Sequence, residues 1–435
     1  MLDINFIREN KEKIKDSLKK RGQPYNPESV EELLSFDKEW RELKGSVDNL
    51  RRERNELTLQ ITKLSKEKKD ISKLVSKAKS LPEEIRNAES RLEELENKRN
   101  NILKEIPNLV DNSVPVGDAS KSKIIETYGK KSRLKFKPKD HADVLEALDL
   151  LDTQTASNVA GSRFYYLKGD LVRLNYALIC LALDFLKSKG FTLIQPPFML
   201  RKNVLEGAMP FGAFEEMIYK IEGEDLYLIG TAEHAINAYY YNKEIPKEKL
   251  PLRFAGISTC FRKELGAHGK DTKGIFRVHQ FEKVEQFVFC KPEEAWKEFD
   301  LILNNSKQLL KALEVPFRFV ILSSQEMGRV PTKTVDFECF FPSQNEYREL
   351  GSCSNCTDYQ ARRSNIRYQE GEMKFVYTLN NTAISTARMM DCFVDNHQQK
   401  DGSIRIPKAL WKYTKFKIIK ATRKINKVKK VISKK

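Results

Sequence analysis

Apolar residues recur at alternating intervals of three and four residues over two stretches in the first quarter of the chain. The first comprises Val47, Leu50, Leu57, Ile61, Leu64, Ile71 and Val75, and the second Ile85, Ala88, Leu92, Leu95, Ile102 and Ile106. This heptad spacing is typical of helices packed along a narrow seam, and Pro82 interrupts it. The pattern predicts an antiparallel coiled-coil hairpin with a break at Pro82, preceded by a helical segment at 3–21.

Beyond the hairpin the pattern changes from one long helical period to short, mixed elements. Prolines and glycines among polar residues indicate a linker at 108–138. Helical patterns follow at 141–151, 171–189, 292–313 and 382–397, and apolar runs typical of strands occur at 190–200, 226–230, 347–350 and 374–379. Strands joined by hairpins with interspersed helices predict an α+β fold, an antiparallel sheet flanked by helices.

These changes of pattern divide the chain into four expected parts. We expect an N-terminal domain with the helical arm at 1–110, a linker and connecting helix at 111–163, an α+β domain at 164–411 and a basic tail at 412–435. A helix of about 38 residues would be about 57 Å long, so the arm must reach a partner rather than fold into a globule.

The formal net charge of the 435-residue chain is +17, and 11 of its lysines and arginines lie between Lys412 and Lys435, where there is no acid. A basic excess favours nucleic acid over membrane as a partner. Structured RNA is a good candidate for the charged arm, although a solvated coiled-coil surface explains most of its charges. The tail has two equal interpretations, an RNA-affinity or targeting appendage and a disordered solvated segment.

The seven cysteines are few and irregularly spaced, which indicates a reducing compartment. Cys353 and Cys356 form one C-x-x-C pair, but no second ligand pair stands out, so structural thiols are favoured over a zinc site. No apolar run approaches the ~20 residues of a membrane span. The acidic residues Asp3 and Glu9 at the start argue against a signal or transit peptide, so we expect a cytoplasmic protein without a membrane partner.

Residues 254–289 carry the candidate chemistry, because two strand-like runs flank a glycine-containing segment at 265–275. The first run ends in Arg262, Lys263 and Glu264, and the second carries Arg277, Val278, His279, Phe281 and Glu285. Arginine forks bind phosphate oxygens, an aromatic face stacks on a purine, and a carboxylate holds an ammonium. The set suits a nucleotide beside an amine; an exposed hairpin with charge pairs is the alternative. The absence of G-x-G-x-x-G and G-x-x-x-x-G-K-[ST] motifs argues against Rossmann and P-loop sites.

From residue 1 to about 410 the chain resembles the class II seryl-tRNA synthetases. The matching elements are motif 1 at 190–200 with Pro197, motif 2 with Arg262 and Glu264, motif 3 at 378–388, the triplet Thr231-Ala232-Glu233, the run Glu349-Leu350-Gly351-Ser352 and the run 358–363. The resemblance implies a class II antiparallel sheet flanked by helices, a tRNA-binding arm and a homodimer. It also implies a serine–tRNA ligase that forms seryl-adenylate from L-serine and ATP, then transfers the seryl group to the 3′ end of tRNA(Ser).

The resemblance also implies roles for individual residues. Arg262, Glu349 and Arg388 would be catalytic, and Glu349 and Ser352 would hold Mg²⁺. The implied serine contacts are Thr231, Ala232, Glu233, Arg262, Glu285, Asn380 and Thr382. The implied ATP contacts are Arg262, Lys263, Glu264, Arg277, Val278, Phe281, Glu349, Leu350, Gly351, Ser352 and Arg388.

Three positions depart from the family's pattern. Asn381 replaces a small residue, Asp395 stands where a glutamate is usual, and the segment 326–340 lacks an alanine-rich run although Asp336 and Glu338 keep its acids. The sequence of motif 3 resembles that of eukaryotic members more than that of bacterial members. Two alternatives remain beside the active ligase, a synthetase-like binding protein without catalysis and a coiled-coil RNA scaffold. The retained set of arginines and carboxylates argues against both, because a scaffold needs none of them.

Overall fold

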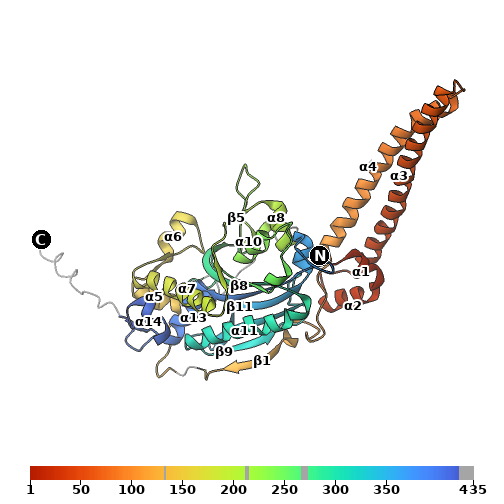
Figure 1. Cartoon of the computed structure of the whole chain (residues 1–435). Helices are drawn as coiled ribbons and strands as arrows, with labels where there is room; N and C mark the ends of the chain where they lie inside the picture. The colour runs from red at the N-terminus through yellow and green to blue at the C-terminus, as the bar shows by residue number, and fades with distance from the viewer. Residues whose placement is uncertain (132–133, 211–214, 266–272, 421–435) are drawn as a thin grey trace, which may run out of the picture. The chain divides into compact units, whose positions relative to one another are not determined.

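The computed structural model describes residues 1–131, 134–210, 215–265 and 273–420, and the chain divides into two compact units at residues 109 and 110. The first unit contains α1 (Ile4–Glu9), α2 (Lys11–Arg21), α3 (Ser29–Lys66) and α4 (Ser72–Glu105). The segment expected at 3–21 is therefore two helices, and α2 ends at Gly22, whose φ of 67° favours glycine. Helices α3 and α4 run side by side as a long hairpin (Figure 1), which confirms the predicted arm.

The turn of the hairpin is not at Pro82, where the sequence had placed the break. Helix α3 ends at Lys66, α4 begins at Ser72, and Pro82 lies inside α4. Lys68 has a φ of 55°, and Asp70 Oδ1 accepts a hydrogen bond of 2.9 Å from the backbone N–H of Ser72. The polar run at 66–70 contributes nothing to the apolar seam, and Asp70 supplies this local hydrogen bond just before α4, so the chain reverses there.

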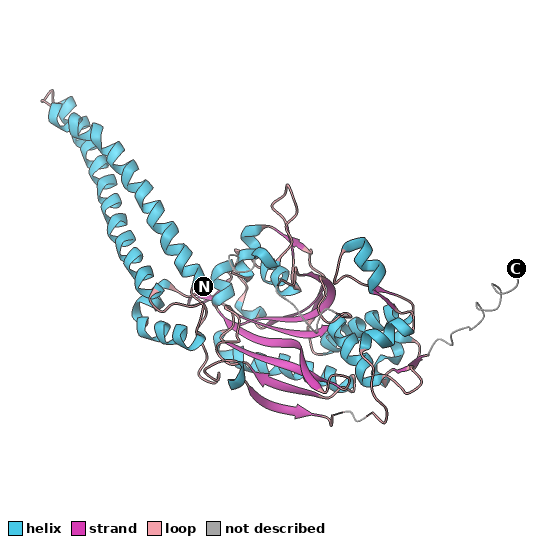
Figure 2. Cartoon of the chain, turned by 180° about the vertical axis from the view of Figure 1, so that it is seen from behind, coloured by secondary structure: helices cyan, strands magenta, loops and turns pink. Residues whose placement is uncertain are grey.

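The second unit is built around one eight-stranded sheet with the order β1-β9-β10-β11-β14-β8-β7-β4. The strands are β1 (Lys123–Tyr128), β4 (Thr192–Ile194), β7 (Leu252–Phe261), β8 (Gln280–Cys290), β9 (Phe317–Ile321), β10 (Lys333–Phe341), β11 (Glu346–Thr357) and β14 (Tyr377–Ser385). Neighbours pair antiparallel except β4 with β7. The strands curve together with helices against them (Figure 2), so the predicted α+β fold is confirmed.

Helices cover the sheet and complete its core. They are α5 (His141–Ala147), α6 (Thr153–Ala160), α7 (Asp170–Ser188), α8 (Lys202–Ala208), α10 (Ala232–Tyr239), α11 (Ala295–Ala312), α12 (Tyr359–Ser364), α13 (Thr386–His397) and α14 (Trp411–Thr414). Leu178 of α7, Ile302 of α11 and Phe393 of α13 are fully buried in one apolar cluster with the strands. Their burial removes the inner faces of all three helices from water, the main stabilising term of such a layer.

Several expected boundaries are wrong. The linker at 108–138 contains β1, because the β-branched run from Lys123 to Tyr128 pairs with β9 at the edge of the sheet. Residues 382–385 continue β14 rather than begin a helix, since they pair with β8. The run from Phe276 to His279 precedes β8 instead of belonging to it.

Some expectations fall on other parts of the chain. Gly266 and Gly269 of the glycine-containing segment, and the tail beyond residue 420, lie outside the described residues. The first part of the expected tail is folded, because β16 (Ile418–Ile419) pairs with β15 (Ile404–Arg405). Within the described ranges, every helix is too short or too polar to cross a membrane.

The interior position of Pro82 generates a stability prediction. Proline has no N–H to donate within α4, and its ring crowds the preceding turn, so Pro82→Ala should raise the free energy of unfolding by about 1–3 kcal/mol. Chemical denaturation followed by helical circular dichroism measures the change. Exposed Lys79→Ala in the same helix is the control and should shift stability by less than about 0.5 kcal/mol. A destabilised Pro82→Ala protein would contradict the assignment of residue 82 to a regular helix interior.

Candidate active site

Most of the predicted site residues line two cavities on the described part of the second unit. The larger cavity, of about 580 Å³, is lined by Thr231, Glu233, Arg262, Glu349, Ser352 and Asn380, together with residues from 328–331. The second is lined by Arg262, Glu264, Val278, Phe281 and Arg388. Arg262 lines both cavities, so one guanidinium joins them.

The N-terminus of α10 forms one wall of the larger cavity. Thr231 Oγ1 accepts a hydrogen bond of 3.2 Å from the Glu233 N–H and donates one of 3.3 Å to Glu285 Oε2. Glu233 Oε1 accepts hydrogen bonds of 2.7 Å from Gln360 Nε2 and 3.0 Å from Asn380 Nδ2. These amides fix the carboxyl group, because each donates to the same oxygen.

The surroundings of Glu233 disfavour its charged form. Burial, and then the neighbouring charge of Glu285, raises the pKa of Glu233 to about 7. Glu285 is itself buried and forms an ion pair with Lys283. A cation brought into the cavity beside Glu233 would therefore find a carboxyl group that loses its proton near neutral pH.

Arg262 is held at the junction of the two cavities by three contacts. Its Nε donates to the Gly230 carbonyl at 3.1 Å, its backbone N–H donates to His279 O at 2.9 Å, and its guanidinium lies 5.4 Å from the centre of the Phe281 ring. Burial, and then the charge of Arg262, lowers the pKa of the adjacent His234 to about 3. That histidine therefore stays neutral and adds no repulsion to the guanidinium.

Motif 3 pairs with β11 through β14, and its arginine adds an ion pair to the same strand. Arg388, in the first turn of α13, lies with Nη1 3.1 Å from Glu349 Oε2 and donates to the Glu349 carbonyl at 3.2 Å. Its guanidinium also lies 5.1 Å from the centre of the Phe276 ring. The sequence elements that carry Arg262, Glu349 and Arg388 thus converge on one region, although they are up to 126 residues apart along the chain.

Acidic residues gather on β10 and β11 where these strands face the larger cavity. Asp336 lies opposite Ser352, and Glu338 lies opposite Glu349. Burial, followed by the charge of Glu349, raises the pKa of Asp336 to about 8. Crowded carboxylates of this kind favour a bound cation, and Mg²⁺ needs few protein ligands when phosphates and water complete its shell. The donor set therefore fits the metal, even though no cluster of three metal-ligating side chains occurs among the described residues.

The base of motif 2 is held by backbone and charge contacts. Glu264 has a φ of 45°, its carbonyl accepts a hydrogen bond of 2.6 Å from Arg163 Nη1, and its carboxylate lies 3.8 Å from Arg277 Nη1. Lys263 points toward the ring of Tyr219, at 5.8 Å from its centre. Arg163 was not predicted, since nothing in its local sequence links it to a residue about a hundred positions later.

Seven predicted residues line neither cavity, namely Ala232, Lys263, Arg277, Glu285, Leu350, Gly351 and Thr382. Ala232, Leu350 and Thr382 are buried, and a Cβ atom added to Gly351 would lie 2.7 Å from Thr382 Cβ and 2.5 Å from Phe337 Cζ. Thr382 therefore packs beneath Gly351. Gly351 is required by this close approach of two strands, so its part in the site is to allow packing.

Two further residues at the cavity were not predicted from the sequence. Lys283 forms an ion pair with Glu285. The sequence could have predicted this pair, because residues two apart on a strand share one face. His234 follows the triplet directly, but its sequence context predicted no role for it. Cys353 and Cys356 are buried, and burial raises the pKa of both thiols well above the ordinary value, so both remain protonated.

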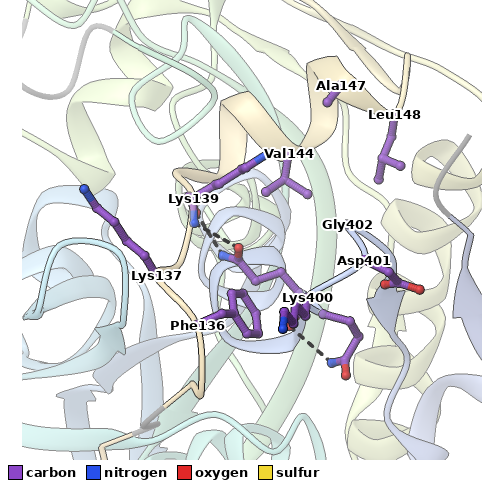
Figure 3. A pocket seen from close by; sticks show the side chains of 11 residues that line it. Phe136, Lys137, Lys139, Val144, Ala147, Leu148, Lys400, Asp401 and Gly402 are labelled. Atoms are coloured by element: carbon purple, nitrogen blue, oxygen red, sulfur yellow. Dashed lines mark hydrogen bonds between the residues drawn. The ribbon is translucent and has the colours of Figure 1, made fainter. Parts of the chain in front are cut away.

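A separate cavity of about 520 Å³ lies between α5 and residues 398–402 (Figure 3). Gln398 closes its floor by accepting from the Lys139 N–H at 3.0 Å and donating to the Lys139 carbonyl at 2.8 Å. Lys137, Lys139 and Lys400 at its rim are exposed. None of the predicted site residues lines this cavity.

Comparison with known proteins identifies the family. The model of the seryl-tRNA synthetase N-terminal domain matches residues 1–110, and the model of the class II tRNA synthetase core domain (G, H, P, S and T) matches residues 216–397. A serine–tRNA ligase of Thermococcus kodakarensis is 46% identical over 443 residues, covering 96% of this chain and 97% of the relative. The chain belongs to the seryl-tRNA synthetase family.

Solved structures agree with this membership. Seryl-tRNA synthetase of Pyrococcus horikoshii complexed with ATP is 44% identical with a TM-score of 0.91, covering 96% of this chain and 99% of that one. The cytoplasmic serine–tRNA ligase of Naegleria fowleri in complex with AMP is 36% identical with a TM-score of 0.86, covering 97% and 99%. The predicted family, fold and class of enzyme are therefore confirmed.

Proposed function

We propose that this chain activates L-serine with ATP and transfers the seryl group to the 3′ end of tRNA(Ser), with the site residues acting as follows. The observation that carries the proposal is that Arg262 lines both cavities, one with a carboxylate and amides and the other with an aromatic ring and arginines. An amino acid and a nucleotide can then meet at one guanidinium. A binding protein without catalysis has no need of such a junction.

The nucleotide is held by the residues that line the second cavity, a recess of only about 10 Å³ that the ligand must extend beyond. Phe281 stacks on the adenine and the Val278 backbone borders it, while Glu264 helps to seat it. Arg262 and Arg277 bind the α-phosphate side, and Arg388 meets the γ-phosphate, because bidentate guanidinium forks match phosphate oxygens. The contacts of Arg388 with Glu349 and Phe276 support this proposal, since they hold its guanidinium in place before a ligand arrives.

In the first step a carboxylate oxygen of serine attacks the α-phosphorus. The bond from that phosphorus to the bridging oxygen breaks, and pyrophosphate leaves with the electron pair. Arg262 holds the attacking carboxylate beside the α-phosphate, so the protein contributes position and charge rather than a nucleophile. In the second step a hydroxyl of the terminal ribose attacks the acyl carbon, and AMP leaves.

Glu349 and Ser352 would hold Mg²⁺, with Asp336 on the neighbouring strand. The ion would supply positive charge to the phosphates of ATP. Burial, and then the charges of Glu349 and Glu338, raise the pKa of Asp336, so these acids repel one another when no divalent metal is bound.

Serine is selected by polar contacts, because it is too small for apolar packing to distinguish it. Glu233 holds the ammonium, with Thr231 and Glu285 behind it, and Asn380 lies on the hydroxyl side. A pocket that hydrogen-bonds a hydroxyl rejects alanine through the polar groups left unpaired. Thr382 acts through the packing of Gly351, which differs from the direct contact implied by the family resemblance.

The arm formed by α3 and α4 binds tRNA(Ser), since it is too long and too charged on its outer faces to serve the core of its own unit. We also propose a homodimer, supported by the exposed apolar side chains Leu193 and Met199 of motif 1 and Tyr176 of the preceding helix α7. A cytoplasmic location is supported by seven free cysteines, one of them the exposed Cys180.

The decisive test is serine-dependent exchange of pyrophosphate into ATP. Arg262→Lys and Arg388→Lys keep the charge but lose the fork, so each should lower kcat for exchange by about 10²-fold or more. Arg405→Lys is the matched control, because Arg405 forms a half-exposed pair with Glu314 away from both cavities. A wild-type protein that shows no exchange at saturating serine and ATP would defeat the proposal.

Serine binding should strengthen as pH rises through about 7, the pKa to which Glu233 is raised. Below that pH the carboxyl group is neutral and must lose a proton before it pairs with an ammonium, so KM for serine should rise about tenfold per pH unit. Measurements of exchange from pH 5.5 to 8 test this. The Glu233→Gln variant should bind serine weakly, and its KM for serine should not change with pH in this way. This result would assign the pH dependence to Glu233 rather than to Asp336. A flat profile for the wild type would exclude the role.

The arm should be needed only for the second substrate. Arg51 and Glu89 face each other across the hairpin at 2.7 Å, so deleting residues 52–88 and closing the gap with a short turn preserves the register below the cut. Pyrophosphate exchange should remain within about twofold, while charging of tRNA(Ser) should fall by at least about 10²-fold. Retained charging would show that tRNA is bound elsewhere.

A further inference from the structure

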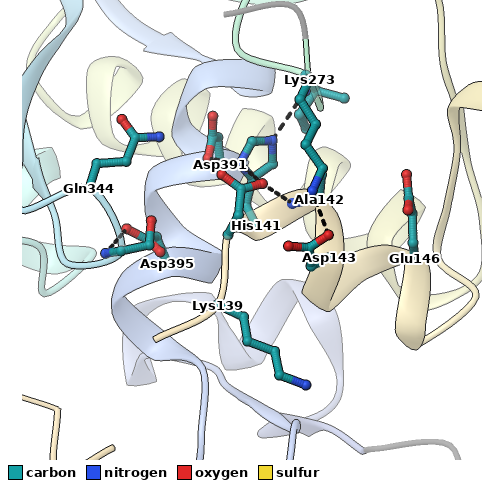
Figure 4. Close-up of polar contacts among 12 residues, drawn as sticks. Lys139, His141, Ala142, Asp143, Glu146, Lys273, Gln344, Asp391 and Asp395 are labelled. Carbon is teal, nitrogen blue, oxygen red and sulfur yellow. Dashed lines mark hydrogen bonds and ion pairs between the residues drawn. The ribbon is translucent and has the colours of Figure 1, made fainter. Parts of the chain in front are cut away.

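His141 lies where two segments of the nucleotide cavity come together (Figure 4). One segment is the strap, which we define as residues 274–278, between the end of motif 2 and β8. The other is α13, which carries Arg388 in its first turn. His141 is the first residue of α5 and only 3% exposed, and it belongs to neither segment.

The two ring nitrogens of His141 face different segments. Nε2 accepts a hydrogen bond of 3.2 Å from the backbone N–H of Ile275, and Nδ1 lies 2.6 Å from Asp391 Oδ1. Because Nε2 is an acceptor, the ring carries its proton on Nδ1, on the side of the Asp391 carboxylate. The histidine thus joins the strap to α13 in its neutral form.

Asp391 depends on this contact. It is fully buried, and neither of its oxygens accepts a well-aligned hydrogen bond from the described residues, so the short approach of His141 is its nearest compensation. Although burial lowers it, the charge of Asp391 raises the pKa of His141 above its ordinary value, with smaller contributions from Asp140 and Asp395. The Ile275 N–H opposes that protonation, because an imidazolium has no lone pair to offer it.

The strap fits His141 closely. Gly274 has a φ of 77°, and a Cβ atom placed on it would lie 1.9 Å from His141 Nε2. Ile275 is fully buried, and the centre of the Phe276 ring lies 3.4 Å from the guanidinium group of Arg348 and 5.1 Å from that of Arg388. A displacement of Ile275 would therefore shift Phe276, which contacts Arg388. It would also shift Val278, which lies three residues further along the same segment.

The contact with α13 reaches Arg388 by a second route. Asp391 follows Arg388 by three residues, so both side chains lie on one face of the helix. Arg388 in turn forms its ion pair with Glu349 of β11. His141 consequently fixes both the helix that carries this arginine and the aromatic ring beneath it.

We propose that His141 is a positioning residue for the nucleotide, which clamps the strap to α13 and so aligns Val278 with Arg388. It touches neither substrate, and no other role for it follows from the family resemblance. The inference rests on the proposed function for its kinetic consequences. The clamp itself is a property of the free protein.

Loss of the contacts of His141 should affect KM for ATP more than KM for serine. His141→Asn keeps a donor near Asp391 but is too short to accept from Ile275, whereas His141→Gln places an oxygen near the position of Nε2. His141→Asn should raise KM for ATP in pyrophosphate exchange about tenfold, the loss of one buried hydrogen bond, with KM for serine changed by less than about twofold. His141→Gln should recover most of that loss.

A second readout needs no catalysis. Hydrogen–deuterium exchange of peptides covering 273–281 should show the Ile275 amide exchanging at least about tenfold faster in His141→Asn, with protection restored in His141→Gln. Asp143→Asn is the matched control, because it breaks the exposed Lys273–Asp143 pair of 2.5 Å beside the strap and should leave KM and protection unchanged. Gly274→Ala adds a methyl group on the strap that would clash with Nε2 of His141. It replaces His141→Asn as the test variant if His141→Asn does not fold.

The possible results distinguish a failure of the His141 clamp from a failure of the proposed function. Wild-type KM for ATP in His141→Asn, or an equal rise in KM for both substrates, would overturn the clamp. A wild-type protein without serine-dependent exchange would remove the proposed function instead. The clamp would then be decided by the amide exchange and by calorimetric binding of ATP to the same variants.

Discussion

The site depends on bringing several carboxylates, two of them half-buried, into one cavity. Glu233, Asp336 and Glu349 line a single cavity, and burial raises the pKa of Glu233 to about 7 and that of Asp336 to about 8. Two like charges 4 Å apart repel by about 4 kcal/mol at an effective dielectric constant near 20, so such a group is stable only with cations beside it. Arg262, Lys283 and Arg388 supply that charge from three segments. In the function proposed above, the serine ammonium and a metal ion add to this positive charge.

The register of β14 decides which face of the sheet is polar. Asn380 points to the cavity and donates to Glu233, whereas the next residue, Asn381, faces the other side and donates to the Ile302 carbonyl at 2.5 Å and to Ser306 Oγ at 2.9 Å. Asn381, which departs from the family pattern, thus forms its hydrogen bonds with α11, on the side of the sheet away from the larger cavity. A hydrogen-bonded network behind a central strand favours one rigid arrangement, which suits a strand that must place a single amide. The departure at Asp395 is also local, because its Oδ2 accepts from the Ser343 N–H at 3.0 Å.

The sequence predicted well those features that depend on local pattern. The helical arm, the β7–β8 hairpin, and the convergence of Arg262, Glu349 and Arg388 follow from periodicity and from motif residues that share one chemistry. The turn of the arm was misplaced, because a proline on the exposed side of a long helix resembles a break until packing is known. Thr382 was expected at the substrate; its packing against Gly351 comes from a contact between strands, and no spacing rule encodes that contact. Arg163 and His141 were missed for the same reason, since each acts on a residue more than a hundred positions away.

The junction at Arg262 explains why the two substrates need not be recognised independently. A guanidinium has five N–H donors, and Nε is already committed to the Gly230 carbonyl, which leaves the terminal nitrogens for the two cavities. Because the group is planar and rigid, a carboxylate bound on one side and a phosphate on the other are held at a fixed separation. The nucleotide side is fixed in turn by the strap and α13, which meet at His141. The reacting atoms are thus brought together by backbone segments whose positions are set outside either pocket.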